Sequence, residues 1–191
     1  RHEGLSFLVN WMDSKNLRVV ADESLSGKRG FIDSFMPCNF NNGRKKMAIS
    51  RGLCVHWVAG NVPLLGMLTL VQAIITKNAN IIKAASSYSG ILPALLKSIS
   101  EQNVKLPTGK TVYGKDITST IAVLYINKED KKSLESLSKL ANTRIAWGGA
   151  EAVNSILSLP KMHQTNDVVF GPKLSFMAIG NHSFGSNRMI K

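Results

Sequence analysis

The chain has 191 residues, of which 44% are hydrophobic and 19% charged, and its 24 basic and 12 acidic residues give a formal net charge of +12. This length and apolar content exclude a disordered chain, and no apolar run reaches the ~18 residues of a membrane-spanning helix. The positive charge favours acidic ligands such as nucleic acid, an anionic membrane or a phosphorylated cofactor, although spread basic residues usually form a solvated surface.

Residues 1–50 show little regular pattern. An amphipathic helix is predicted at 5–12, followed by a short apolar run at 17–21 and by turn-rich loops at 26–30 and 39–43. We expect this part to be an N-terminal lead-in that is partly irregular. Because the chain opens on an arginine rather than an initiator methionine, we expect a fragment or a processed product of a longer protein.

From residue 51 onward, short apolar runs alternate with longer segments of helical periodicity. The predicted strands cover 53–58, 80–84, 120–125, 143–147, 167–170 and 175–179. The predicted helices cover 63–75, 88–102, 131–140 and 150–157. This alternation predicts an α/β fold with a Rossmann-like, doubly wound and mostly parallel sheet over residues 51–180. The polar residues 181–191 predict a loop or a ragged end.

Two polar residues stand at predicted strand ends, where open α/β sheets place their ligands. Asn61 lies where the first strand turns into a helix, and its amide N–H can stabilise an oxygen on which negative charge develops. Lys83 ends the next strand and can meet a ribose hydroxyl or a phosphate. Both have simpler interpretations, because asparagine is a common turn residue and a strand-end lysine can extend into solvent.

Gly148 and Gly149 lie between a predicted strand and a predicted helix. Glycines there let the backbone approach a ligand, and the free N–H groups of the helix N-terminus suit a phosphate. The pair does not form the GxGxxG fingerprint, so a tight turn that requires positive φ is an equal alternative. The segment 171–173, Gly-Pro-Lys, follows the strand at 167–170 and is locally only a turn.

The cysteines and histidines predict no metal site, because neither residue type shows ligand spacing. Cys54 is expected to be an inert buried side chain, and the use of only two cysteines suits a reducing cytoplasm. His56 lies inside an apolar strand and is expected to be a hydrogen-bonded core histidine rather than a catalyst.

Four segments in this order resemble the aldehyde dehydrogenase superfamily. They are 57–63 (WVAGNVP), 76–83 (TKNANIIK), 146–153 (AWGGAEAV) and 169–173 (VFGPK). The similarity covers about residues 51–180 and is closest to the acyl-CoA reductase branch, which includes the fatty-acid reductases of bacterial luminescence. It implies an NAD(P)-binding domain of the Rossmann-like type.

The resemblance also implies roles for individual residues. Asn61 matches the asparagine that helps to hold the thiohemiacetal oxyanion, although Val62 replaces the aromatic residue that normally follows it. Lys83 matches the lysine that meets the adenosine ribose of NAD or NADP, and Ser86 is its neighbour. Gly148 and Gly149 match the turn beside the cofactor pyrophosphate.

The last matching segment lies near the reaction centre. Gly171 and Lys173 match the Gly-Gly-Lys turn near the nicotinamide and the catalytic cysteine. The hydrolytic members carry a glutamate where this chain has Val169, and an apolar side chain cannot activate water. A reductase that exchanges a thioester needs no activated water. No cysteine follows Cys54, so the family's nucleophile has no match and the chain corresponds to the cofactor-binding part of a longer enzyme.

We therefore expect a cytoplasmic oxidoreductase that reduces an acyl thioester to an aldehyde through a cysteine-bound acyl group. The expected cofactor is NADPH or NADH, with a slight preference for NADPH from the basic charge, and the isolated chain is expected to be inactive. We expect that the chain binds no nucleic acid and has no membrane span. Whether it forms a homo-oligomer or binds a partner enzyme is left open.

Two other functions remain alternatives. One is a basic, non-catalytic binding module, which the scattered aromatic residues disfavour because such modules interleave aromatics with a basic face. The other is a related phosphate-linked reductase, such as a relative of the glutamyl phosphate reductases.

Overall fold

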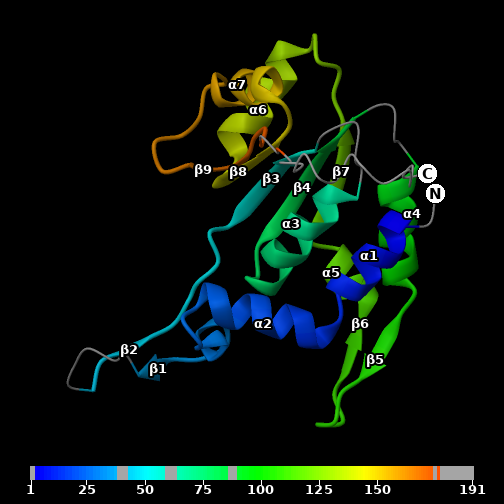
Figure 1. Ribbon diagram of the computed structural model, residues 1–191, viewed down its shortest axis with the longest axis vertical. Coiled ribbons are helices and arrows are strands. Elements are labelled where there is room, and N and C mark those ends of the chain that lie inside the picture. The colour runs from blue at the N-terminus through cyan, green and yellow to red at the C-terminus, as the bar shows by residue number, and fades with distance from the viewer. Residues whose placement is uncertain (1–2, 38–42, 59–63, 86–89, 174–175, 177–191) are drawn as a thin grey trace, which may run out of the picture.

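The computed structural model describes residues 3–37, 43–58, 64–85, 90–173 and 176. Its centre is a parallel five-stranded sheet in the order β7-β4-β3-β8-β9 (Figure 1). The strands are β3 (Leu53–Trp57), β4 (Ala79–Ala84), β7 (Ile121–Tyr125), β8 (Thr143–Trp147) and β9 (Asn166–Phe170). From β3, the chain adds β4 and then β7 on one side of the sheet; it then returns to the other side of β3 and adds β8 and β9. This confirms the predicted doubly wound α/β sheet.

Helices cover both faces of the sheet, as right-handed crossovers between parallel strands require. The covering helices are α3 (Leu65–Ile75) and α4 (Ile91–Ser100) on one face, and α6 (Lys131–Leu140) and α7 (Ala150–Leu157) on the other. The first face buries Met67, Leu70, Ile82, Ala84 and Leu92. The second face buries Val55, Trp57, Leu137, Ala146 and Ile156. The binding region is therefore built on a sheet that is packed from both sides.

Several predicted elements match the structure closely. The helices predicted at 131–140 and 150–157 and the strand predicted at 143–147 have the observed bounds. The helix predicted at 88–102 is shorter, because α4 begins at Ile91 and ends at Ser100. The strand predicted at 175–179 falls almost wholly outside the described residues.

A hairpin and a short helix between α4 and β7 were not predicted. They are β5 (Asn103–Lys105), β6 (Thr111–Tyr113) and α5 (Gly114–Thr118). Gly114 permits this arrangement, because a Cβ atom there would lie 1.8 Å from the carbonyl oxygen of Ile99. The turn of the hairpin contains Gly109, whose φ is +83°.

The first fifty residues contain more helix than the pattern predicted. They form α1 (Glu3–Trp11), α2 (Ser14–Ser24), η1 (Arg29–Ile32), β1 (Met36–Pro37) and β2 (Lys45–Lys46). The predicted first helix is confirmed, and its Leu8 is buried in the same cluster as Met67 and Leu92. The division of the chain at residue 50 stays a prediction. In the described part of the chain, no helix has the length and hydropathy needed to cross a bilayer.

Candidate functional site

A cleft of about 1330 Å³ lies at the carboxyl ends of strands β3, β4, β8 and β9. The strand order reverses between β3 and β8, so their connections lead to opposite faces of the sheet and leave a crevice beyond their ends. Ligands of doubly wound folds bind in this crevice. The cleft is therefore the candidate site on grounds of topology alone.

Five of the predicted cofactor-binding residues line this cleft: Lys83, Gly148, Gly149, Gly171 and Lys173. They come from the ends of three different strands, and only the parallel sheet brings them together. The predicted catalytic Asn61 and the predicted neighbour Ser86 lie outside the described residues. The roles assigned to all seven residues stay predictions.

The glycine turn opens the N-terminus of α7 toward the cleft. Gly149 is the N-cap, with φ −67° and ψ 171°, and no side chain caps the helix. A Cβ atom on Gly149 would meet nothing within 4 Å. Neither a left-handed backbone nor close packing therefore requires glycine at this position, and the first-turn N–H groups of the helix remain available to a ligand.

Lysines give the cleft a positive field. Lys128, which precedes α6, and Lys131, its first residue, line the cleft together with Lys83 and Lys173. Glu135 of the same helix is a carboxylate in the lining. Burial lowers the pKa of Lys83, which has no hydrogen bond or ion pair with the residues that the structure describes. Lys128 and Lys131 are exposed to solvent where they border the cleft. Such a field favours phosphate groups.

Below the cleft, one face of the sheet contains a closed polar network around His56. Its Nε2 lies 3.1 Å from Oδ1 of Asn80, and its Nδ1 lies 3.1 Å from Oγ1 of Thr69. The amide nitrogen of Asn80 is already used on a backbone carbonyl, so Nε2–H of the histidine donates to the amide oxygen. Burial lowers the pKa of His56 to about 4. The predicted role of a hydrogen-bonded core histidine is confirmed.

The same network supports the strand ends below the cleft. The indole Nε1 of Trp147 donates to Oγ1 of Thr69 at 3.3 Å. Trp147 also stacks on Phe170, with ring centroids 4.0 Å apart and an interplanar angle of 6°. These rings immediately precede Gly148 and Gly171, so the stacking holds the strand ends from which the two turns of the cleft begin.

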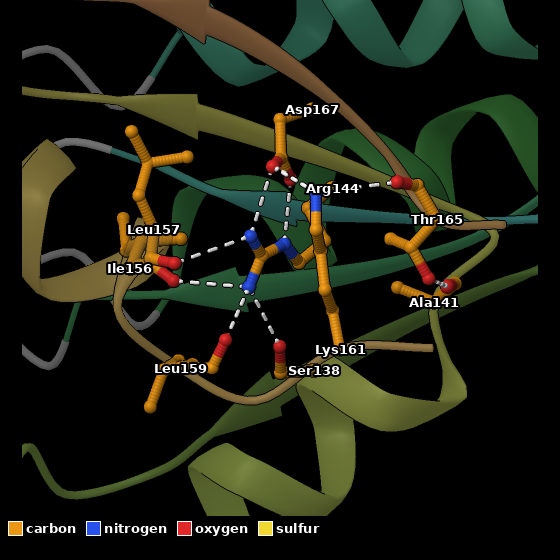
Figure 2. A network of polar contacts seen from close by, with 9 residues as sticks. All are labelled: Ser138, Ala141, Arg144, Ile156, Leu157, Leu159, Lys161, Thr165 and Asp167. Atoms are coloured by element: carbon orange, nitrogen blue, oxygen red, sulfur yellow. Dashed lines mark hydrogen bonds and ion pairs between the residues drawn. The ribbon is translucent and has the colours of Figure 1, made fainter. Parts of the chain in front are cut away.

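A buried arginine holds the wall formed by α7 (Figure 2). The side chain of Arg144 is 1% exposed and its Nε and Nη2 donate to the carboxylate of Asp167 at 2.6 and 3.0 Å. Its Nη1 donates to the carbonyl oxygens of Ile156 and Leu159 at 3.1 and 2.9 Å. Because Ile156 and Leu159 line the cleft, Arg144 positions one of its walls.

This arrangement satisfies a buried charge fully. Nη1 of Arg144 also bonds Oγ of Ser138, and Lys161 pairs with Asp167 at 2.7 Å (Figure 2). The hydrogen bond from Arg144 lowers the pKa of Asp167, with a smaller effect from Lys161. Sequence reasoning missed this pair. The available signal was an arginine in the middle of an otherwise apolar strand, which is rarely buried without a partner.

Val169 and Cys54 bear on the chemistry of the cleft. Val169 lines it where hydrolytic aldehyde dehydrogenases would place their glutamate, so that position supplies no general base. Cys54 is buried on the other face of the sheet, packed with Ala73 and Ile145, and burial raises the pKa of its thiol. Within the described residues, no cluster of three potential metal ligands occurs. Val169 therefore supplies no base for the activation of water, while the lysines and the uncapped N-terminus of α7 suit a phosphorylated ligand.

The chain is similar to known proteins of one family. The family model "Acyl-CoA reductase (LuxC)" matches residues 1–190. The long-chain acyl-protein thioester reductase 2 of Photobacterium leiognathi is 33% identical over 178 residues, which cover 91% of this chain and 34% of that protein.

Two further relatives are long-chain acyl-protein thioester reductases. That of Photorhabdus luminescens is 32% identical over 159 residues, covering 81% of this chain and 30% of the relative. That of Aliivibrio fischeri is 35% identical over 130 residues, covering 68% and 25%. The chain thus spans about a third or less of the length of these relatives. The resemblance to acyl-CoA reductases is confirmed, and the chain belongs to the acyl-CoA reductase (LuxC) family.

Proposed function

We propose that this chain is the nucleotide-binding part of a cytoplasmic enzyme that reduces a long-chain acyl thioester to an aldehyde at the expense of NADPH. The overall change consumes the thioester, the reduced cofactor and one proton, and releases aldehyde, thiol and the oxidised cofactor. The relatives' names specify an acyl-protein thioester, so the acyl donor is proposed to be a protein-bound thioester. The acyl group passes through a cysteine that is not among the residues of this chain.

The convergence of Lys83, Gly149, Gly171 and Lys173 in one cleft at the switch point carries this proposal. The groups present fit a dinucleotide, because an uncapped helix N-terminus and four lysines match its phosphates. Sheets of this type that bind NAD commonly place an acidic residue near the end of the second strand, where it accepts the ribose 2′-hydroxyl. Here β4 carries Lys83 instead, which can meet the ribose of either cofactor, and the net positive charge of the chain favours the 2′-phosphate of NADPH.

The chain's own residues would position and stabilise the ligand. Lys83 and Ser86 would bind the adenosine ribose, and the turn of Gly148 and Gly149 would bind the pyrophosphate. Gly171 and Lys173 would hold the nicotinamide, which would supply hydride to the acyl carbon.

Asn61 and Val169 are proposed to act at the acyl carbon. The side-chain amide of Asn61 donates to the oxygen on which negative charge develops as the acyl carbon becomes tetrahedral. Val169 supplies no base, so water is not activated at that position and the acyl group is preserved for reduction.

A titration tests the nucleotide site directly. NADPH and NADH are titrated into the protein while nicotinamide fluorescence is followed, and Lys83→Ala is compared with the wild type. We expect saturable binding, tighter for NADPH, that weakens roughly tenfold in Lys83→Ala because a charge-assisted contact to phosphate is lost.

Lys97→Ala is the matched control, because Lys97 is exposed on α4 and does not line the cleft. It should bind NADPH like the wild type. A folded protein that shows no saturable binding of either nucleotide, or equal losses in both variants, would contradict the proposed function.

A further inference from the structure

A residue that lines the cleft carries a buried hydrogen-bond donor without a partner. Trp57 is the last residue of β3, is 4% exposed and lines the cleft. Its indole Nε1 is the sole buried side-chain nitrogen or oxygen, among the residues that the structure describes, without a hydrogen-bond partner. Buried N–H groups are almost always paired, since leaving one unpaired costs free energy. This nitrogen therefore requires an explanation.

The fold satisfies the equivalent group one strand away. Trp147 ends β8, the neighbour of β3, and its indole Nε1 donates to Oγ1 of Thr69. The two tryptophans lie on opposite faces of the sheet: Trp147 packs with Cys54 and Ala73, while Trp57 packs with Leu137 and Ile156. Both tryptophans line the cleft, and the unpaired indole is the one on the face that α6 and α7 cover.

A second unpaired donor lies beside the first. Trp57 and Lys83 are register partners in the parallel pairing of β3 with β4, so both side chains project from the same face at the same level. Paired strands are about 4.8 Å apart, so the two donors can reach neighbouring oxygens of one group. Lys83 is half-buried and has no partner among the described residues. Both side chains only donate, and the complementary group is therefore rich in acceptor oxygens.

We propose that the indole N–H of Trp57 donates a hydrogen bond to an oxygen of the adenosine ribose, or of its phosphate, when a nucleotide occupies the cleft. This inference rests on the proposed function, because it places a second residue on the ligand of Lys83. Nε1 is buried although Trp57 lines the cleft, so binding requires a rotation of the indole that brings Nε1 to the ligand. The ligand then supplies the acceptor that the indole N–H lacks within the described protein. Trp57 thereby contributes to the affinity for the nucleotide.

Replacement of the tryptophan by an aromatic residue without a donor tests this. Trp57→Phe is titrated with NADPH, with adenosine 2′,5′-bisphosphate and with reduced nicotinamide mononucleotide. The affinity for the first two should fall roughly tenfold, as expected for loss of a hydrogen bond to a polar or charged oxygen, and that for the third should not change. Trp11→Phe, on α1 and away from the cleft, is the matched control and should bind all three like the wild type.

A closer isostere removes the ambiguity of a smaller ring. Incorporation of 3-benzothienylalanine at position 57 replaces the N–H by sulfur and keeps the bicyclic shape. This protein should fold like the wild type and show the same roughly tenfold loss for adenosine 2′,5′-bisphosphate.

The outcomes separate the two proposals. Wild-type affinity in the isostere, together with weakened binding in Lys83→Ala, would overturn the role of Trp57 and leave the proposed function intact. A folded wild-type protein that binds neither NADPH nor the bisphosphate would overturn both. Loss of affinity for the bisphosphate in the isostere, with unchanged affinity for the mononucleotide, supports the inference.

Discussion

Arg144 and Lys83 are both basic residues of the central sheet, on strands β8 and β4, and their side chains project toward the helices α6 and α7. Arg144 is deeply buried and bonds a carboxylate, a hydroxyl and several carbonyl oxygens. Lys83 is half-buried at the edge of the cleft and bonds none of the described residues.

The difference separates structural from ligand-binding polar groups. A buried polar group that the fold satisfies completely stabilises that fold and offers nothing to a ligand, as for Arg144 and His56. A group left without partners at the carboxyl ends of parallel strands can serve a ligand, as we propose for Lys83 and Trp57. Substitutions at the satisfied groups, Arg144 and His56, should therefore change stability. Substitutions at the cleft should change the affinity for the ligand.

The largest expected effect comes from breaking the buried ion pair. Asp167→Ala leaves the guanidinium of Arg144 buried without its carboxylate, and we expect the free energy of unfolding to fall by about 3 kcal/mol. Urea denaturation monitored by circular dichroism measures this. In the double variant Arg144→Met with Asp167→Ala, the loss should be smaller than the sum of the two single losses. A loss below about 0.5 kcal/mol for Asp167→Ala would contradict a role of the Arg144–Asp167 pair in the stability of the fold.

A moderate effect is expected from protonation of the histidine network. Burial lowers the pKa of His56 from 6.5 to about 4, so the unfolded chain binds a proton that the folded protein excludes between these values. The corresponding stability is present above pH 6.5 and is lost as the pH falls toward 4. Between pH 7 and pH 5 the free energy of unfolding should decrease by about 2 kcal/mol.

Denaturation in urea at a series of pH values measures this slope, and His56→Gln is the comparison because glutamine does not titrate. Asp167 also has a lowered pKa, but its contribution is lost only at more acidic pH, near and below the ordinary range of a carboxylate. Parallel slopes for the variant and the wild type between pH 7 and pH 5 would assign the effect to other groups.

The smallest expected effect on stability comes from a substitution at the glycine turn of the cleft. Gly149→Ala adds a methyl group that meets no protein atom within 4 Å, at a backbone conformation that alanine adopts. We expect the free energy of unfolding to change by less than about 1 kcal/mol, which includes the weaker helix capping by alanine. The affinity for NADPH should fall about fivefold, since the backbone can no longer approach the pyrophosphate as closely.

Gly90→Ala is the control for this variant, because Gly90 also caps a helix without a side-chain hydrogen bond and has open space at its Cβ. Differential scanning fluorimetry and the nicotinamide titration are measured on both. Equal affinities in the two variants would indicate that the glycine turn does not contact the ligand.

The sequence predicted the elements wherever local periodicity is strong. The helices at 131–140 and 150–157 and the strand at 143–147 emerged with their observed bounds, because each carries a complete pattern within its own residues. The hairpin of β5 and β6 was missed, since its short strands are exposed and show little alternation of burial. Helix α2 was missed because none of its described residues is fully buried, which leaves a weak apolar stripe.

The candidate site shows the same division. The sequence by itself determined which strand ends carry Lys83, the paired glycines and Lys173, and the family to which these turns belong. Only the tertiary structure decided that Trp57 pairs in register with Lys83, and that Arg144 meets Asp167 across β8 and β9. The reason is physical: periodicity within a segment reports which residues are buried, whereas the identity of a partner depends on the order and register of strands far apart in the chain.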